Sequence, residues 1–398
     1  MTASDDLTGP LNGLKVIDIT TIVMGPFATQ IMAEMGADVI KIEAPSGDTL
    51  RGIGPARHPD MGWMFIQTNR GKRSVVLDLK TPDGRASLIE LASTADVVVS
   101  NMRPAAMRRL GLTYETFSQS NPRVIFATLS GYDERGPMAG KPAFDDLIQG
   151  GAGIPHLYKL AGSTTPRYAP ITLSDRVVGL YGLSSILAAL FSREKTGRGQ
   201  TVEVPMFESM AHFVLGDHIG GALFEPPLGP TGYPRLLSEQ RRPYPTRDGY
   251  VCTMIYNNDQ WRRFLAAIGQ PDLFETDPRF ASVATRTQHV DEINQIIADQ
   301  MAERTTDECI AMLEAADLPV ARLNTIETLL DDPQLAASGL IQHLEHPTEG
   351  TIRVAGAPMR FSGTPIGPIR PAPLLGEHNI EVLGSPPLSG KKRGPQAD

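Results

Sequence analysis

The sequence predicts an α/β protein whose larger domain is a Rossmann-like, mostly parallel sheet. Residues 15–20 have the pattern of a short buried strand, 26–35 that of a helix ending at Gly36, and 38–43 that of a second strand. Parallel strands need a long crossover between them, and a helix is the usual one. Repetition of this strand–helix–strand pattern therefore indicates a sheet with helices on both faces.

The same alternation continues along the chain. A helical pattern opens at residues 81–84 and continues through Leu91, and a much longer one begins at Ser174. Leucine and valine residues spaced three or four apart give the long helix an apolar face, which ends at the glycine-rich residues 197–200. Further strand-like runs cover residues 74–79, 95–100, 123–129 and 201–204.

A second, smaller α+β domain is expected after a change of composition. Residues 226–249 are rich in proline, glycine and arginine, which is typical of a linker. We therefore expect a large domain over 1–225, a small domain over 250–325, and a linker with a C-terminal segment over 326–398.

Composition excludes several classes of protein. The 398 residues carry a formal net charge of −8, which gives no general attraction to nucleic acid or anionic lipid. No run approaches the roughly 20 apolar residues of a membrane span, and the acidic start does not resemble a signal peptide. Cys252 and Cys309 match no metal or redox spacing. We expect a cytoplasmic protein with no nucleic-acid or membrane partner.

The common nucleotide and metal motifs are missing. The turn at residues 20–26 contains one glycine instead of Gly-x-Gly-x-x-Gly, and no Gly-x-x-x-x-Gly-Lys follows a strand. No His-Glu-x-x-His occurs, so the histidines, His343 and His346 among them, are predicted to be surface residues and no metal site is expected. No Gly-x-Ser-x-Gly is present either, which weakens a hydrolase hypothesis.

Basic residues cluster in the predicted large domain. In an α/β sheet these side chains could face a ligand crevice at the strand ends, or they could form ordinary ion pairs at a solvated surface. The two groups are Arg70, Lys72, Arg73 and Lys80 around one strand, and Arg103, Arg108 and Arg109 after another.

Asp175 is the most informative acidic residue. It follows Ser174, a candidate N-cap, in the first turn of the long helix, where the helix dipole favours an ionised carboxylate. Such a carboxylate can attack a thioester carbonyl. The alternative is that Asp175 only complements the helix dipole.

Several segments, in order, resemble the class III CoA-transferase family, also called the CaiB/BaiF family. The resemblance covers nearly the whole chain, and the order and spacing of the segments make it specific. The segments are residues 13–18, 25–26, 36–43, 69–74, 77–80, 95–97 with Asn101, 109–111, 195–200, 355–358 and 373–378.

The resemblance implies a set of functional residues. Asp175 takes the place of the nucleophilic aspartate, and coenzyme A is a substrate, with no permanently bound cofactor. Ala44 stands where the family has an arginine, and no glycine-rich loop is found between Tyr233 and Asn258. The implied CoA contacts are Val23, Met24, Leu77, Lys80, Asn101, Arg103, Arg109 and Lys141.

The resemblance also implies an interlocked homodimer. Each monomer would be an open ring whose large domain is completed by the C-terminal segment. The implied partners are an acyl-CoA, a small carboxylic acid and a second copy of the chain.

Three functions are compatible with this resemblance. The first is transfer of CoA from an acyl-CoA, with succinyl-CoA or another short dicarboxylyl-CoA as first candidate, to a carboxylic acid through an aspartyl anhydride and an enzyme–CoA thioester. The second is an α-methylacyl-CoA racemase. Racemases of the family use a histidine at the position of Phe144 and a glutamate near Tyr256, so transfer is favoured here. The third is a CoA-binding module without catalysis.

Overall fold

The computed structural model describes residues 7–384, which form two compact units. Unit 1 comprises residues 7–152, 169–212 and 336–384, and unit 2 comprises 153–168 and 213–335. Unit 2 thus includes residues 153–168 and 213–225, which the sequence analysis assigned to the large domain. Helix α7 (Ile154–Leu160) contacts α10 (Pro234–Leu237), which joins the first of these segments to unit 2. Residues 1–6 and 385–398 lie outside the described residues.

Unit 1 is built on a six-stranded sheet with the order β3-β2-β1-β4-β5-β6, and every neighbouring pair is parallel. This confirms the predicted parallel α/β sheet. Strand order reverses between β1 and β4, which pair directly with Val16 opposite Val97 and Asp18 opposite Val99. The strands are β1 (Lys15–Asp18), β2 (Asp38–Glu43), β3 (Arg73–Val76), β4 (Val97–Ser100), β5 (Ile125–Ser130) and β6 (Thr201–Pro205).

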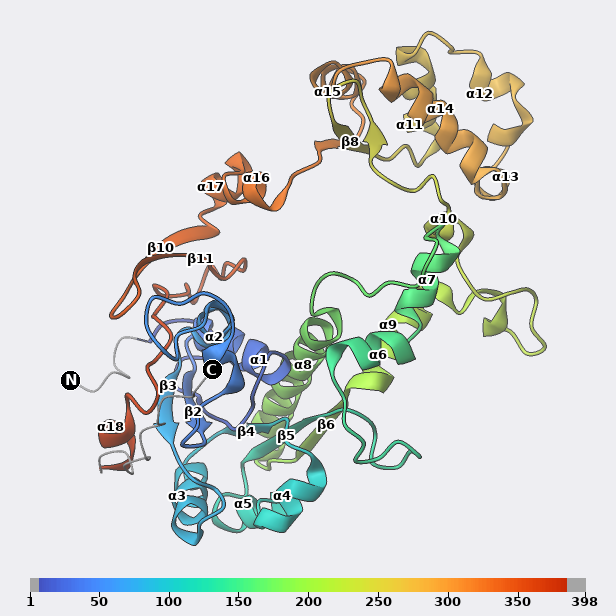
Figure 1. The fold of residues 1–398 in the computed structure, drawn as a ribbon. Helices are drawn as coiled ribbons and strands as arrows, with labels where there is room; N and C mark the ends of the chain where they lie inside the picture. Colours follow the sequence, from blue (N-terminus) through green and yellow to red (C-terminus); the bar gives the residue numbers. More distant parts are fainter. Residues whose placement is uncertain (1–6, 385–398) are drawn as a thin grey trace, which may run out of the picture. The chain divides into compact units, whose positions relative to one another are not determined.

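Helices cover both faces of this sheet (Figure 1). On one face, Ile17 and Val98 pack in a buried cluster with Leu88 of α3 and Phe117 of α5. On the other face, α1 contacts β1, β2 and β4, while α8 contacts α1, β5 and β6. The helices of unit 1 include α1 (Met24–Glu34), α2 (Trp63–Asn69), α3 (Pro82–Ser93), α4 (Pro104–Leu110), α5 (Tyr114–Ser120), α6 (Asp145–Gly151) and α8 (Leu173–Thr196).

Helix α8 is long and apolar enough to cross a membrane by composition alone. It is instead a core helix of unit 1, because Val178, Leu183 and Ile186 are buried on the side that meets α1 and the sheet. The helix ends at Gly197, which has the left-handed φ of 72° that a glycine adopts without strain. The predicted end of the long helix is confirmed.

The C-terminal segment packs onto edge strand β3 of unit 1. His378 donates its backbone N–H to the Ser74 carbonyl at 3.0 Å, and the Asn379 side chain accepts from the Val76 N–H at 2.9 Å. Before it come the hairpin strands β10 (Ile341–His346) and β11 (Gly350–Ala355). The prediction that His346 lies at the surface is wrong: it is buried and its Nε2 lies 2.9 Å from the Ala372 carbonyl oxygen.

Unit 2 has its own sheet and its own core. Three antiparallel strands, β7 (Tyr244–Pro245), β8 (Tyr250–Thr253) and β9 (Val320–Arg322), accompany a group of short helices. Trp261, Phe264 and Phe280 pack in the core with T-shaped ring contacts. The main helices of unit 2 are α9 (Met206–His218, which begins in unit 1), α11 (Asn258–Ala267), α12 (Leu273–Thr276), α13 (Val283–Gln288), α14 (Val290–Ala302), α15 (Thr306–Ala315) and α16 (Ile326–Leu330).

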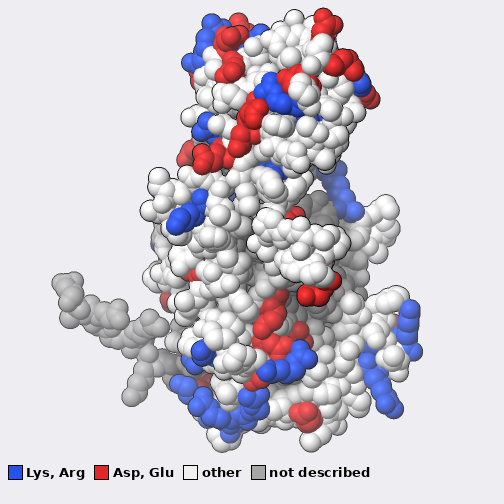
Figure 2. All heavy atoms as spheres, turned by 90° about the vertical axis from the view of Figure 1, so that its right-hand side faces the viewer, with Lys and Arg blue, Asp and Glu red and all other residues white. Residues whose placement is uncertain are grey.

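The surface carries no extended basic area on the face that Figure 2 shows. Lysine and arginine side chains lie there in separate small groups among uncharged residues, with acidic side chains between them. This distribution agrees with the net charge of −8. On this face, an anionic ligand would have to bind one of the small groups of basic side chains.

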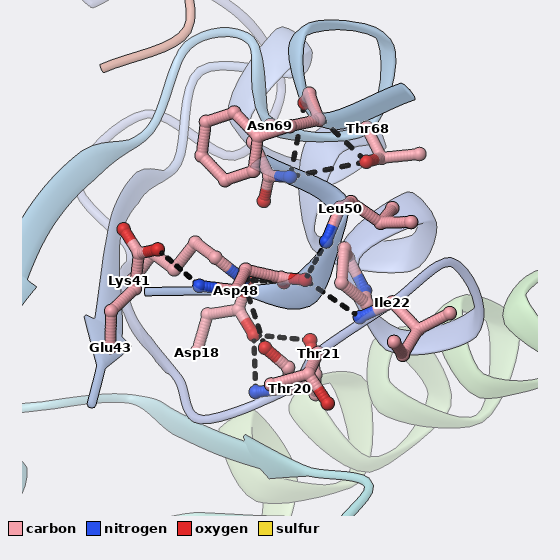
Figure 3. A network of polar contacts seen from close by, with 12 residues as sticks. Asp18, Thr20, Thr21, Ile22, Lys41, Glu43, Asp48, Leu50, Thr68 and Asn69 are labelled. Carbon is pink, nitrogen blue, oxygen red and sulfur yellow. Dashed lines mark hydrogen bonds and ion pairs between the residues drawn. The ribbon is translucent and has the colours of Figure 1, made fainter. Parts of the chain in front are cut away.

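A network of buried ions lies beneath the carboxyl end of β1 (Figure 3). Lys72 Nζ lies 2.9 Å from an Asp18 carboxylate oxygen, and Lys41 Nζ lies 2.9 Å from one of Asp48. All four side chains are fully shielded from solvent. Burial alone would raise the pKa of Asp18, but the Lys72 and Lys41 ammonium groups outweigh it and hold that pKa well below its usual range.

We expect Lys72→Met to destabilise unit 1, because it leaves the Asp18 carboxylate buried without its nearest cation. The loss should be about 3–5 kcal/mol in the free energy of unfolding, measured by urea denaturation. The control Arg135→Met removes an exposed partner of Asp133 and should leave the unfolding midpoint unchanged. Equal effects of the two substitutions would contradict a structural role for the buried network.

Candidate active site

A cavity of about 280 Å³ opens in unit 1 where the strand order reverses. Parallel α/β sheets bind ligands at this place, outside the carboxyl ends of the strands. The wall is formed by the turn after β1, the turn after β4, the end of β5, the loop before α6 and the start of α8. Side chains from these five segments include Thr21, Ile22, Met24, Asn101, Arg103, Leu129, Tyr132, Lys141, Phe144, Asp145 and Asp175.

The turn after β1 is fixed by hydrogen bonds from both sides. The Asn101 side chain accepts from the Thr21 N–H at 3.0 Å and donates to the Thr21 carbonyl at 2.8 Å, which ties the turns after β1 and β4 together. Ile22 has a φ of 70°, which is strained for a β-branched residue. Asp48 accepts from the Ile22 N–H at 3.3 Å, and Lys41 donates to the Thr20 carbonyl at 2.9 Å (Figure 3). The buried network therefore holds this part of the cavity wall.

Asp175 is the third residue of α8 and lies in the cavity wall. Its backbone N–H donates to Asp145 Oδ1 at 3.0 Å, so a carboxylate of α6 satisfies this end of α8. The prediction that Ser174 is the N-cap is wrong. Thr172 occupies that position without a side-chain cap, while Ser174 is buried inside the helix and donates its hydroxyl to the Asp145 carbonyl.

The electrostatic environment of Asp175 differs from the sequence expectation. Burial, and then the like charge of Asp145, raise the pKa of Asp175 to about 7. Arg176 acts in the opposite direction and is outweighed; its guanidinium stacks on the Phe27 ring at 4.5 Å from the centroid. Burial and Asp145 therefore act against the stabilisation of the carboxylate that was expected from the helix dipole.

The Asp175 carboxylate is also distinguished by its lack of partners. Among residues 7–384, no group donates a hydrogen bond to it and no cation pairs with it. The other acidic side chains of the cavity are engaged, since Glu134 pairs with Arg108 at 3.1 Å and Asp145 accepts from Gln149 at 2.6 Å. Asp175 is thus left available to an incoming group.

The structure brings some of the expected CoA contacts together with Asp175 and separates others. Those that line the same cavity are Met24, Asn101, Arg103 and Lys141. Two others do not line it and are buried in core clusters, namely Val23 and Leu77. Two more are exposed but do not line it, namely Lys80 and Arg109.

The first basic group of the sequence does not face a ligand crevice. Arg70 pairs with Glu34 at 2.9 Å, and Lys72 pairs with Asp18 at 2.9 Å. Arg73 likewise binds Asp38, its neighbour across β2 and β3, at 2.5 Å. These three residues form ion pairs within the fold, as the ion-pair alternative expected, but Arg70 and Lys72 are buried and do not lie at a solvated surface.

Two residues that shape the site were missed. Asp145 touches Asp175 from 30 positions away in the sequence, and Asp48 supports Ile22 from 26 positions away. The one sequence signal for Asp145 is its position next to Phe144, which stands where racemases of the family have a histidine.

Comparison with known proteins identifies the family. The model of CoA-transferase family III matches residues 11–379. The chain belongs to this family. It is therefore an enzyme of the CoA-transferase class, and the resemblance inferred from its motifs is confirmed.

Relatives with assigned names match over nearly their whole length. The chain is 32% identical to a succinate–glutarate CoA-transferase of Agrobacterium fabrum, covering 96% of this chain and 97% of the relative. It is 33% identical to a formyl-CoA:oxalate CoA-transferase of Escherichia coli O157:H7, with 95% of both chains covered. A crystal structure of a CaiB/BaiF family protein from Brucella suis matches with a TM-score of 0.79 at 28% identity, covering 95% of this chain and 99% of that one.

The raised pKa of Asp175 predicts a pH dependence for this family III CoA-transferase. If the ionised carboxylate reacts, kcat/KM should rise with pH through a midpoint near 7. Asp145→Asn removes the like charge but keeps an oxygen that can accept from the Asp175 N–H, so the midpoint should move to lower pH. The measurement is the pH profile of kcat/KM.

Asp146→Asn is the matched control, because Asp146 is the next residue and is exposed outside the cavity. Its midpoint should equal that of the unchanged enzyme. A midpoint that does not move in Asp145→Asn would contradict the proposed effect of Asp145 on Asp175.

Proposed function

We propose that the protein transfers CoA between two short carboxylic acids, with Asp175 as the covalent nucleophile. The observation that carries the proposal is a partly buried, unpartnered carboxylate in the wall of the cavity at the reversal of strand order. A carboxylate with no hydrogen bonds to break and little hydration to lose is suited to attack a carbonyl carbon.

The proposed chemistry proceeds by paired substitutions at carbonyl carbons. An Asp175 oxygen attacks the acyl-CoA carbonyl, the carbon–sulfur bond breaks, and CoA leaves as the thiolate while an aspartyl–acyl anhydride forms. The thiolate then attacks the Asp175 carbonyl and expels the first acid as its carboxylate, which leaves an aspartyl–CoA thioester. The acceptor carboxylate repeats these steps in reverse order. One thioester replaces another, so no ATP is consumed and no atom is oxidised or reduced.

The protein must hold the departing CoA close during this exchange. Arg103 and Lys141 line the cavity and supply positive charge for the phosphates of CoA. Asn101 also lines the cavity, and its side chain forms hydrogen bonds with the backbone of Thr21. The same residue therefore forms part of the binding surface and holds the neighbouring turn in place.

The acids that we propose are short dicarboxylates, with succinyl-CoA as donor. Support comes from relatives named for succinate and glutarate and for oxalate, which are all short diacids. The racemase alternative is less well supported, because Phe144 lines the cavity where that activity needs a proton-transfer group. The homodimer and the cytoplasmic location stay predictions.

The proposal predicts ping-pong kinetics with succinyl-CoA and glutarate. Double-reciprocal plots at several fixed concentrations should give parallel lines, because each acid leaves before the next one reacts. Asp175→Asn keeps the backbone N–H that contacts Asp145 but loses the nucleophile, so kcat should fall by about 10³-fold or more.

Asp146→Asn again serves as the control and should retain full activity. If the Asp175→Asn variant turned over as fast as the unchanged enzyme, the proposed mechanism would be contradicted. Exchange of the α-proton of the acyl-CoA in heavy water, without transfer between acids, would favour the racemase instead.

A further inference from the structure

Unit 2 contains a cavity of its own, of about 380 Å³, which the proposed chemistry does not use. Its apolar wall includes Trp261 of α11 and Ile293 and Ile297 of α14. Its volume is within the range of small-molecule sites. Four arginines line it, while no aspartate or glutamate does: they are Arg235, Arg241, Arg242 and Arg286.

Arg286 gives the strongest indication that the cavity is suited to bind an anion. Its side chain is buried, with the residue 6% exposed, and it donates to the Phe280 carbonyl at 3.2 Å and to the Asn258 side-chain oxygen at 2.8 Å. Both partners are uncharged, and no acidic residue within 7–384 forms an ion pair with Arg286. Burial lowers the pKa of Arg286, with no carboxylate nearby to oppose that effect. A buried cation without a counter-ion is costly, and a bound anion would remove that cost.

The other three arginines of the cavity are likewise free of acidic partners among the described residues. The Arg235 guanidinium lies 5.6 Å from the ring centroid of Tyr233 and from that of Tyr256, and Arg242 donates to the Gln240 side chain at 3.2 Å. Apart from Arg167, the other described arginines of unit 2 are paired, as Arg247 is with Glu308 and Arg279 with Asp277. The unpaired arginines of unit 2 are thus concentrated at the cavity.

We propose that this cavity, the arginine cavity, binds a short aliphatic dicarboxylate. One carboxylate would bind the Arg286 guanidinium, whose planar fork suits a carboxylate, and the second would bind the arginines at the rim. The methylene groups between them would lie against Trp261, Ile293 and Ile297. This apolar wall favours an organic diacid over inorganic phosphate, which has no hydrocarbon to bury.

This inference goes beyond the proposed function, since binding in the arginine cavity requires no reaction at Asp175. It assigns unit 2 its own role in recognising the class of acid that we propose as substrate. The two proposals can therefore fail separately.

Tryptophan fluorescence tests the proposal directly. The protein has two tryptophans, and Trp63 lies in unit 1, so the variant Trp63→Phe leaves Trp261 as the only reporter. Glutarate is titrated into this variant in the absence of any acyl-CoA, so that no transfer can occur. We expect a saturable change in Trp261 emission. Adding Arg286→Met should weaken glutarate binding at least about tenfold, in line with the loss of one charge-assisted contact.

Two further variants separate binding from folding. Arg241 is exposed and its side chain forms no hydrogen bond within the described residues, so Arg241→Gln should weaken binding without affecting stability. Arg247→Gln removes a paired arginine outside the cavity and should bind glutarate normally. The proposal is overturned if glutarate gives no saturable change, if Arg241→Gln and Arg286→Met both bind as tightly as their parent, or if phosphate binds as tightly as glutarate.

Discussion

The buried ion network beneath the turn after β1 is the constraint on which the rest of unit 1 depends. Asp18, Lys41, Asp48 and Lys72 are fully shielded from water, and none of these charges is stable there without its partner. Their pairing requires β1, β2, β3 and the short helix at Thr49–Gly52 to meet in one arrangement. The same groups hold the carbonyl of Thr20 and the N–H of Ile22, so the fold and the cavity wall are set by one set of contacts.

Carboxylates in unit 1 divide into two kinds by their partners. Asp18 and Asp48 are buried, and the ion pairs and hydrogen bonds that their carboxylates form leave them poorly placed to attack another group. Asp175 is held in place through its backbone N–H, while its carboxylate is left without a partner among the described residues. Burial and the charge of Asp145 then raise its pKa to about 7, so the proposed nucleophile changes its ionisation near neutral pH.

Much of the fold could be predicted from the sequence because it depends on local patterns. The strand at Asp38–Glu43 and the helix that ends before Gly197 follow from periodicity and from glycine at a left-handed position. Lys72 could not be assigned, because its partner Asp18 lies 54 positions away and only the folded sheet brings them together. For the same reason the local sequence predicts Ser174 as the cap of α8, although Asp145 on another helix supplies the acceptor. Asp175 itself was identified through the family resemblance more than through its local sequence.

The most direct test of the account is to capture the covalent intermediate on Asp175. The purified protein is incubated with succinyl-CoA, treated with hydroxylamine or borohydride, and digested for peptide mass spectrometry. The account predicts a modification on Asp175 that requires succinyl-CoA and is absent from Asp175→Asn. A protein that transfers CoA while Asp175 stays unmodified, or that carries the modification on Asp145, would contradict it.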